Sequence, residues 1–131
     1  MTILGSRSEL TAQGVVEVVV PNLQPALAFY QALGFSVERE TPTFVTLRYD
    51  TLYLYLAENA DAPTAPRWTN VRVIVSNVDA VWQHVQARGM AVATPIGDRA
   101  YGLRDFTVKD PAGFEVRFAQ VLEPPSMPPN S

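Results

Sequence analysis

The sequence predicts an α+β protein of two tandem β-α-β-β-β modules, whose curved mixed β-sheet encloses a cleft and carries its helices outside. Two observations lead to this prediction. Residues 16–35 are repeated at residues 71–90, with seven of the twenty aligned positions identical, and three strand-like segments follow each copy. The identical positions include alternating valines, an asparagine and a glycine, which are residues with structural roles. A duplicated supersecondary unit therefore accounts for most of the chain.

Each copy opens on a predicted strand in which valine occupies every second position. Successive side chains of a strand point to opposite faces of a sheet, so alternating valines predict one buried face. These residues are Val16, Val18 and Val20 in the first copy and Val71, Val73 and Val75 in the second.

Each strand leads into a predicted helix. Asn22 and Asn77 stand where an N-cap side chain accepts hydrogen bonds from free backbone amides, and Gly34 and Gly89 fit a left-handed C-terminal cap. Pro25 falls in the first turn, where its missing N–H costs nothing. Between the caps, apolar residues recur at helical spacing and predict one buried stripe for each helix. The stripes are Leu23, Ala26, Leu27, Tyr30 and Leu33, and then Val78, Val81, Trp82 and Val85.

Three strand-like segments follow each helix, at about residues 36–39, 43–48 and 52–57 and again at about 91–94, 105–108 and 114–120. The connector between the copies is rich in alanine, proline and aspartate, and the tail is rich in proline. We therefore divide the chain into an N-terminal arm (1–14), a first module (15–57), a linker (58–68), a second module (69–120) and a disordered tail (121–131).

The strand faces turned away from the helices carry a mixture of aromatic, amide and charged side chains. Two modules related by a twofold axis would turn these faces toward each other and enclose a cleft, so we take their polar and aromatic residues, with two nearby aromatic residues, as ligand-binding candidates. The candidates are Glu17, Tyr53, Tyr55, Trp68, Asn70, Arg72, Tyr101, Glu115 and Arg117.

Composition excludes several classes of function. The chain has no cysteine and one histidine, which exclude disulfides, thiolate chemistry and histidine-rich metal sites. Its net charge is −3 and its lysines and arginines are scattered, which argues against nucleic acid as a partner and favours a neutral or cationic one. No apolar run reaches the roughly 20 residues of a membrane span and the start does not resemble a secretory signal, so we expect a soluble cytoplasmic protein.

Two stretches carry a resemblance to a known family. VVPNLQPALAFYQALGF and YGLRDFTVKDPAGFEVRF resemble the first helix and the last strands of the vicinal oxygen chelate superfamily, which includes glyoxalase I, extradiol dioxygenases and bleomycin-resistance proteins. In the metal-dependent members, His, Gln or Glu holds a cation from four places. Carried over by motif, those places fall on Val15, Tyr55, Asn70 and Arg117. None is a normal ligand for these metals, so the resemblance implies no metal, no cofactor and no catalytic residue here.

The metal-free branch of the superfamily sequesters drugs without altering them, and the stretch from Tyr101 to Arg104 is similar to what that branch carries. The resemblance implies a homodimer that exchanges N-terminal strands, with residues 9–14 as the arm, and an aromatic or hydrophobic antibiotic as ligand. The alternative is a glyoxalase-like lyase or isomerase that uses Glu17 or Glu115 as general base. A third hypothesis is a binding module for a metabolite.

Individual residues also have structural interpretations. Arg72 and Arg117 either anchor a ligand or form an internal ion-pair network with Glu17 and Glu115. The aromatic candidates either stack on a flat ligand or pack in the ordinary way. Three further residues have simpler roles: His84 is expected in solvent, Glu58 either ends its strand or joins an oxygen-only cation site, and Asp110 opens a turn with Gly113.

Overall fold

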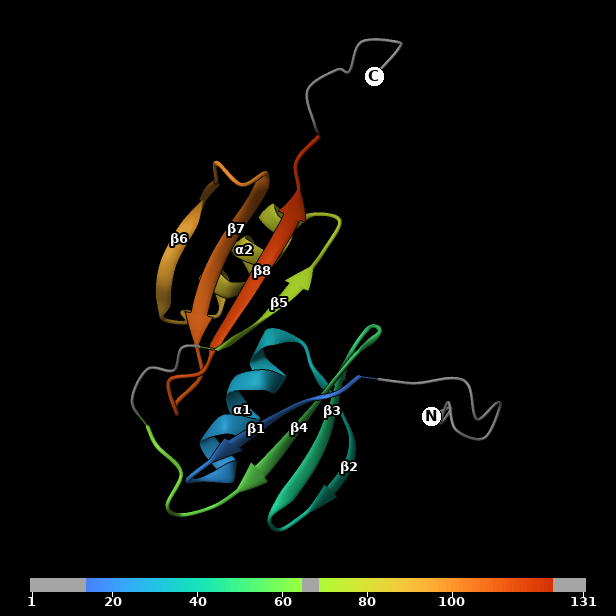
Figure 1. Cartoon of the computed structure of the whole chain (residues 1–131), viewed down its shortest axis with the longest axis vertical. Coiled ribbons are helices and arrows are strands. Elements are labelled where there is room, and N and C mark those ends of the chain that lie inside the picture. The colour runs from blue at the N-terminus through green and yellow to red at the C-terminus, as the bar shows by residue number, and fades with distance from the viewer. Residues whose placement is uncertain (1–13, 65–68, 124–131) are drawn as a thin grey trace, which may run out of the picture. The chain divides into compact units, whose positions relative to one another are not determined.

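The computed structural model describes residues 14–64 and 69–123, and it contains the two predicted modules (Figure 1). The first runs β1 (Val16–Val20), α1 (Leu23–Leu33), β2 (Ser36–Thr41), β3 (Phe44–Tyr49) and β4 (Leu52–Glu58). The second runs β5 (Asn70–Ile74), α2 (Val78–Ala87), β6 (Val92–Asp98), β7 (Leu103–Lys109) and β8 (Glu115–Val121). The prediction of an α+β fold with two tandem β-α-β-β-β modules is confirmed.

Both modules form a four-stranded mixed sheet with the same topology. The first sheet has the order β1-β4-β3-β2 and the second the order β5-β8-β7-β6. In each, the first strand of the module runs parallel to the fourth, and the other pairs are antiparallel. The equivalent positions of the repeat are therefore equivalent positions in the two sheets.

The chain divides into two compact units, which are described separately below. The first unit comprises residues 1–66 with 110–114, and the second comprises 67–109 with 115–131, as far as these residues are described. The turn between β7 and β8 thus belongs with the first unit. No helix in the described ranges is long and apolar enough to cross a membrane.

The core of the first unit lies between α1 and one face of its sheet. All five residues of the predicted apolar stripe of α1 are buried, which confirms that prediction. The residues opposite them on the sheet are also buried: Val18, Val20, Val45, Leu47, Leu54 and Leu56. Because β3 pairs Val45 with Leu56 and Leu47 with Leu54, these side chains share one face.

The core of the second unit is built in the same way and is less completely covered. Val78 and Val85 of α2 are buried, whereas Val81 and Trp82 are half-buried. The Trp82 ring meets Phe106 edge to face at 5.1 Å, and Phe106 stacks on Phe118 at 5.5 Å. His84 is exposed on this helix, as expected.

The two helix starts are capped from the fourth strand of their own sheet. Glu58 Oε2, at the end of β4, accepts a hydrogen bond from Leu23 N at 3.0 Å, and Gln120 Oε1 of β8 accepts one from Val78 N at 3.0 Å. The prediction of an Asn77 cap is confirmed, because its Oδ1 accepts from Ala80 N at 3.1 Å. The same prediction for the first helix is wrong: the Asn22 side chain makes no capping bond. A carboxylate interacts favourably with the partial positive charge of a helix start, so the Glu58 carboxylate is a stronger acceptor for the start of α1 than the neutral Asn22 amide.

The helix ends follow the sequence prediction. Gly34 closes α1 with a φ of 114°, and Gly89 follows α2 with a φ of 65°. Both angles lie in the left-handed region, where residues other than glycine are strained.

The Asp110 side chain makes hydrogen bonds both within its own turn and to helix α1. Asp110 Oδ1 accepts hydrogen bonds from Ala112 N and Phe114 N, each at 2.9 Å, and Gly113 supplies a φ of 88°. The predicted turn chemistry is therefore confirmed. In addition, the Tyr30 hydroxyl of α1 donates to Asp110 Oδ2 at 2.8 Å, and both residues are buried. This bond fixes the turn to helix α1.

Candidate functional site

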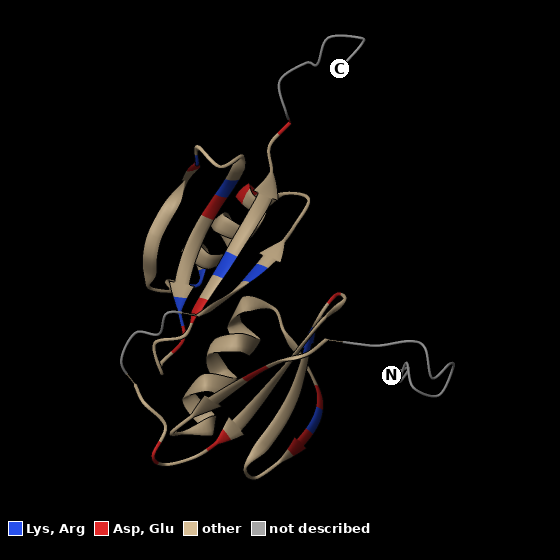
Figure 2. Ribbon diagram, in the orientation of Figure 1, with Lys and Arg blue, Asp and Glu red and all other residues tan. Residues whose placement is uncertain are grey.

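The richest polar surface of the described residues is the face of the second sheet that points away from α2, here called the open face of the second sheet. Its residues follow from the strand register, because residues paired across neighbouring strands share a face. Figure 2 shows basic and acidic residues on the neighbouring strands β5, β7 and β8. The side chains of the open face are Asn70, Arg72 and Ile74 of β5, Leu103, Asp105, Thr107 and Lys109 of β7, and Glu115, Arg117, Ala119 and Val121 of β8.

Asp105 is the central group of this face. Its Oδ1 accepts a hydrogen bond from Arg99 Nε at 2.8 Å, and its Oδ2 accepts one from the Tyr101 hydroxyl at 2.7 Å. Arg72 Nη2 lies 3.9 Å from Oδ2. Although burial disfavours the charged carboxylate, the hydrogen bonds and the nearby arginines outweigh it and hold the pKa of Asp105 below its usual value. Asp105 is therefore an ionised group at neutral pH that orients three side chains.

Tyr101 is exposed yet fixed in position. The residue is 59% exposed, while its hydroxyl is bonded to the buried Asp105 carboxylate. That hydrogen bond is the main cause of its raised pKa, so the phenol stays neutral. The guanidinium carbon of Arg72 lies 5.5 Å from the centre of the Tyr101 ring, within the range of a cation–π contact.

Arg117 uses only part of its hydrogen-bond donors within the described residues. Its Nη2 donates to Glu115 Oε1 at 2.9 Å, whereas its buried Nε finds no hydrogen-bond partner among the described residues. Part of the predicted ion-pair network is thus present, since Arg117 pairs with Glu115. Arg72 forms its ion pair with Asp105, a residue that was not among the candidates.

The open face of the first sheet, turned away from α1, carries three aromatic residues, Phe44, Tyr53 and Tyr55. Tyr55 is paired with Glu17 on one side and with Thr46 on the other, so these side chains share a face. Phe44 meets the Tyr55 ring edge to face at 5.3 Å. Tyr53 and Tyr55 are half-buried and Glu17 is exposed. The hydroxyl of Thr46 is buried without a partner among the described residues.

The residues at the expected metal positions do not fit a divalent cation. Val15 has no donor atom, and Arg117 brings a positive charge already paired with Glu115. Tyr55 and Asn70 are poor substitutes for histidine or carboxylate ligands. The described residues contain no cluster of three or more histidine, aspartate or glutamate side chains that could hold a metal. Glu58, which the sequence allowed in an oxygen-only site, caps α1 instead.

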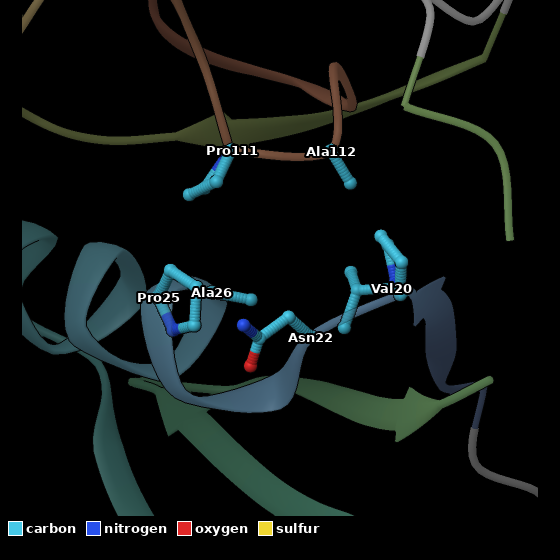
Figure 3. Close-up of a pocket in the computed structure, with 7 residues that line it drawn as sticks. Val20, Asn22, Pro25, Ala26, Pro111 and Ala112 are labelled. Atoms are coloured by element: carbon cyan, nitrogen blue, oxygen red, sulfur yellow. The ribbon is translucent and has the colours of Figure 1, made fainter. Parts of the chain in front are cut away.

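A small pocket in the first unit lies beside the start of α1, as Figure 3 shows. Its volume is about 110 Å³, and its surface is apolar apart from one amide side chain. The lining residues are Val20, Pro21, Asn22, Pro25, Ala26, Pro111 and Ala112. A volume of this size is well below that of ordinary ligand pockets, which makes the pocket a packing feature of the Asp110 turn.

The sequence found some of these groups and missed others. It placed Arg72, Tyr101, Glu115 and Arg117 among the candidates, and the structure brings them together, with Asn70, around the open face of the second sheet. Trp68 lies outside the described residues.

The residues that sequence reasoning missed are Asp105, Arg99 and Thr107 in the second unit and Phe44 and Thr46 in the first. Polar residues alternate with Phe106 and Val108 along β7, and that alternation is the signal that would have identified Asp105 and Thr107.

Comparisons with known proteins agree with this architecture. Bleomycin-binding protein complexed with bleomycin has a similar structure, with a TM-score of 0.72, 16% identity, and coverage of 84% of this chain and 98% of that one. A glyoxalase/bleomycin resistance protein from Catenulispora acidiphila gives a TM-score of 0.70 with 26% identity, covering 85% and 99%. A lactoylglutathione lyase from Agrobacterium tumefaciens gives 0.68 with 16% identity, covering 86% and 96%.

The sequence comparisons are more specific. No curated protein matches the sequence at a significant level. A family model matches residues 12–118, which is most of the chain. This chain therefore belongs to the Glyoxalase/Bleomycin resistance protein/Dioxygenase superfamily.

Proposed function

We propose that this protein binds and sequesters a flat aromatic or hydrophobic small molecule of the antibiotic type, without a metal ion. The observation that carries the proposal is Tyr101. Tyr101 is 59% exposed as a residue, but its hydroxyl is anchored by the buried Asp105 carboxylate. A ring that is already immobilised loses little conformational entropy when a ligand stacks on it, so such a ring is a preorganised binding surface.

The surroundings of Tyr101 support a binding role. Arg72 lies against its ring, and guanidinium groups stack on flat ligands as well as on aromatic side chains. Separately, within the first unit, the open face of the first sheet carries an aromatic surface of its own, formed by Phe44, Tyr53 and Tyr55. Exposed aromatic residues with a few oriented polar groups are typical of small-molecule sites.

The absence of usual metal ligands at the family's metal positions favours binding over chemistry. The lyase or isomerase alternative needs Glu17 or Glu115 as a free base. Glu115 already accepts a hydrogen bond from Arg117, which opposes that role. The structural likeness to a bleomycin-binding protein supports an antibiotic as the first ligand to try.

Calorimetric titration with metal-free bleomycin in the presence of a chelator tests the proposal. Saturable binding with a defined stoichiometry per chain is the expected result. Replacing Tyr101 with leucine removes the stacking surface and should weaken binding by roughly 3- to 10-fold. Tyr49→Leu is a control for loss of a tyrosine from the protein, because Tyr49 packs against Phe35 in the first unit.

The outcomes separate the versions of the proposal. No heat with bleomycin excludes that drug, and the same titration is then run with a panel of flat aromatic antibiotics and metabolites. Failure of the whole panel at millimolar concentration contradicts sequestration. Binding of a metabolite alone favours a metabolite-binding module over a resistance protein.

We also propose that the protein is a homodimer in which residues 9–14 are exchanged between chains. The resemblance to the drug-sequestering branch is the support for this assembly. Sedimentation of the full chain and of a chain without residues 1–13 tests it: the full chain should sediment as a dimer and the shortened one as a weaker dimer or a monomer. A monomeric full chain at high concentration contradicts the proposal.

A further inference from the structure

The open face of the second sheet carries more positive than negative charge. Four basic side chains, Arg72, Arg99, Lys109 and Arg117, contribute to it, against the two carboxylates Asp105 and Glu115. Arg99 is used internally, because its Nε and Nη2 donate to the side chain and backbone carbonyl of Asp105. The remaining basic groups are Arg72 and Arg117, which are paired with each other, and the exposed Lys109 at the end of β7.

These two arginines are immediate neighbours. Arg72 of β5 is paired with Arg117 of β8 in the register of the parallel strands, so both point to the open face. Like charges at directly opposed positions destabilise a sheet. Such a pair is favourable where a negatively charged group lies between or above the two guanidinium groups.

Both guanidinium groups keep free hydrogen-bonding capacity. Arg72 approaches Asp105 only at 3.9 Å, which is longer than a hydrogen bond, and its side chain makes no hydrogen bond to the described residues. Arg117 uses one Nη for Glu115, and its Nε has no partner there. Each of the two side chains is 32% exposed, so an incoming anion can reach them.

We infer that Arg72 and Arg117 form an anion site and that the ligand of this protein is a flat aromatic compound carrying a carboxylate or similar oxyanion. The ring lies on Tyr101, and the oxyanion accepts hydrogen bonds from Arg72 and Arg117. This inference rests on the proposed function and specifies its ligand class. It also reverses the expectation from the net charge of −3, because the local charge of the open face decides what binds there.

The test compares two probes of the same shape, 2-naphthoate and 2-naphthamide, which differ in charge. Calorimetry at neutral pH and low ionic strength should give an affinity about tenfold or more higher for the carboxylate, as expected for charge-assisted hydrogen bonds. Added salt should reduce this preference. A shift of the Arg117 Nε–Hε resonance on addition of 2-naphthoate should report the contact directly.

Variants assign the preference to the two arginines. Arg72→Gln and Arg117→Gln should each remove most of the preference for the carboxylate, measured as the ratio of the two affinities, so that a loss of stacking common to both probes cancels. Arg117→Lys keeps the charge but loses the planar fork, so an intermediate preference is expected. The control is Arg88→Gln, which changes the net charge equally at an exposed position at the end of α2, on the other side of the sheet.

Each outcome decides the inference. Equal affinity for both probes overturns the anion site, while aromatic binding, and with it the proposed function, stands. If Arg88→Gln reduces the preference for the carboxylate as much as Arg72→Gln and Arg117→Gln do, the anion site is also overturned, because the preference is then a long-range effect of net charge. Failure of both probes at millimolar concentration overturns the anion site even if bleomycin binds, and failure of bleomycin and the aromatic panel as well overturns the proposed function too.

Discussion

The hydrogen bond between Tyr30 and Asp110 predicts a large loss of stability from the removal of a single oxygen atom. Tyr30→Phe deletes the hydroxyl that donates to Asp110 Oδ2 at 2.8 Å, and it leaves the ring and its packing in place. Tyr30 is completely buried and Asp110 is 4% exposed, so water cannot replace the lost donor. We expect the unfolding free energy to fall.

The magnitude follows from the partners that remain. A hydrogen bond to a charged group contributes about 1.5–3 kcal/mol. Asp110 Oδ1 keeps its two backbone donors, Ala112 N and Phe114 N, so the carboxylate does not become fully unsatisfied. A loss of about 2 kcal/mol is the reasonable value, which for a chain of this size lowers the melting temperature by roughly 6–10 °C.

A second tyrosine in the same chain provides a matched control. The Tyr101 hydroxyl also donates to an aspartate, Asp105, at 2.7 Å, but this bond is only partly buried and the residue is 59% exposed. In Tyr101→Phe, water can reach the vacated position, so the loss should stay below about 1 kcal/mol. Urea unfolding of the parent and both variants measures the two differences. Equal losses in the two variants would refute the argument that burial sets the strength of these bonds.

Three further predictions concern the helix ends and pH. Asn77→Ala should reduce the unfolding free energy by about 1 kcal/mol, whereas Asn22→Ala should have little effect, because of the two asparagines only Asn77 caps its helix with its side chain. Urea unfolding measures both changes, and equal losses of stability would contradict this assignment of the caps. Gly34→Ala should destabilise the protein by about 1 kcal/mol or more, because φ is 114° at this position and the added Cβ would lie 3.4 Å from the Tyr49 ring. Thermal unfolding measures the effect, and an unchanged midpoint would show that the backbone relaxes. Folding lowers the pKa of the Asp105 carboxyl, so its contribution to stability is present above the usual pKa of 3.8 and is lost as the pH falls through the pKa of the folded state. The unfolding free energy, measured from pH 6 to pH 2, should therefore depend less on pH in Asp105→Asn than in the parent. The same pH dependence in both proteins would contradict this.

The sequence predicted the fold well because each local signal agreed with the others. The valine alternation of β1 and β5, the helical stripes and the terminal glycines all specify the same repeated unit. Strand bounds were less accurate. β6 reaches Asp98, four residues beyond the predicted end, and its pairing with β7 is irregular at two places. Bulges of this kind depend on the partner strand, which local sequence does not specify.

The cap of α1 shows why one local motif failed. Asn22 and Asn77 occupy the same place in the repeat, and each is a good N-cap residue by type. The helix start of α1 instead receives a carboxylate from Glu58, which is 35 residues away in the chain. Tertiary structure decides whether a local or a distant side chain accepts the hydrogen bond of the helix start, so the spacing of residues near one helix does not identify the capping residue.

The candidate site was only partly predictable for a similar reason. Alternation along β8 placed Glu115 and Arg117 on the face away from the helix, and the structure agrees. Alternation could not show that Asp105, on a different strand, would collect Arg99, Tyr101 and Arg72. These contacts depend on strand order and register, which become visible only in the folded sheet.

The duplicated fold carries two different chemistries on its open faces. Tyr55 and Arg117 occupy equivalent positions in the fourth strands, yet Tyr55 contacts the Phe44 ring and Arg117 pairs with Glu115. Backbone geometry and helix-facing residues constrain such positions weakly, because the side chains point away from the core. The two sheets could therefore diverge without loss of the fold. The resemblance places a metal ligand of other members at the position of Arg117, and the positive charge of this arginine opposes a cation there and agrees with the proposed oxyanion ligand.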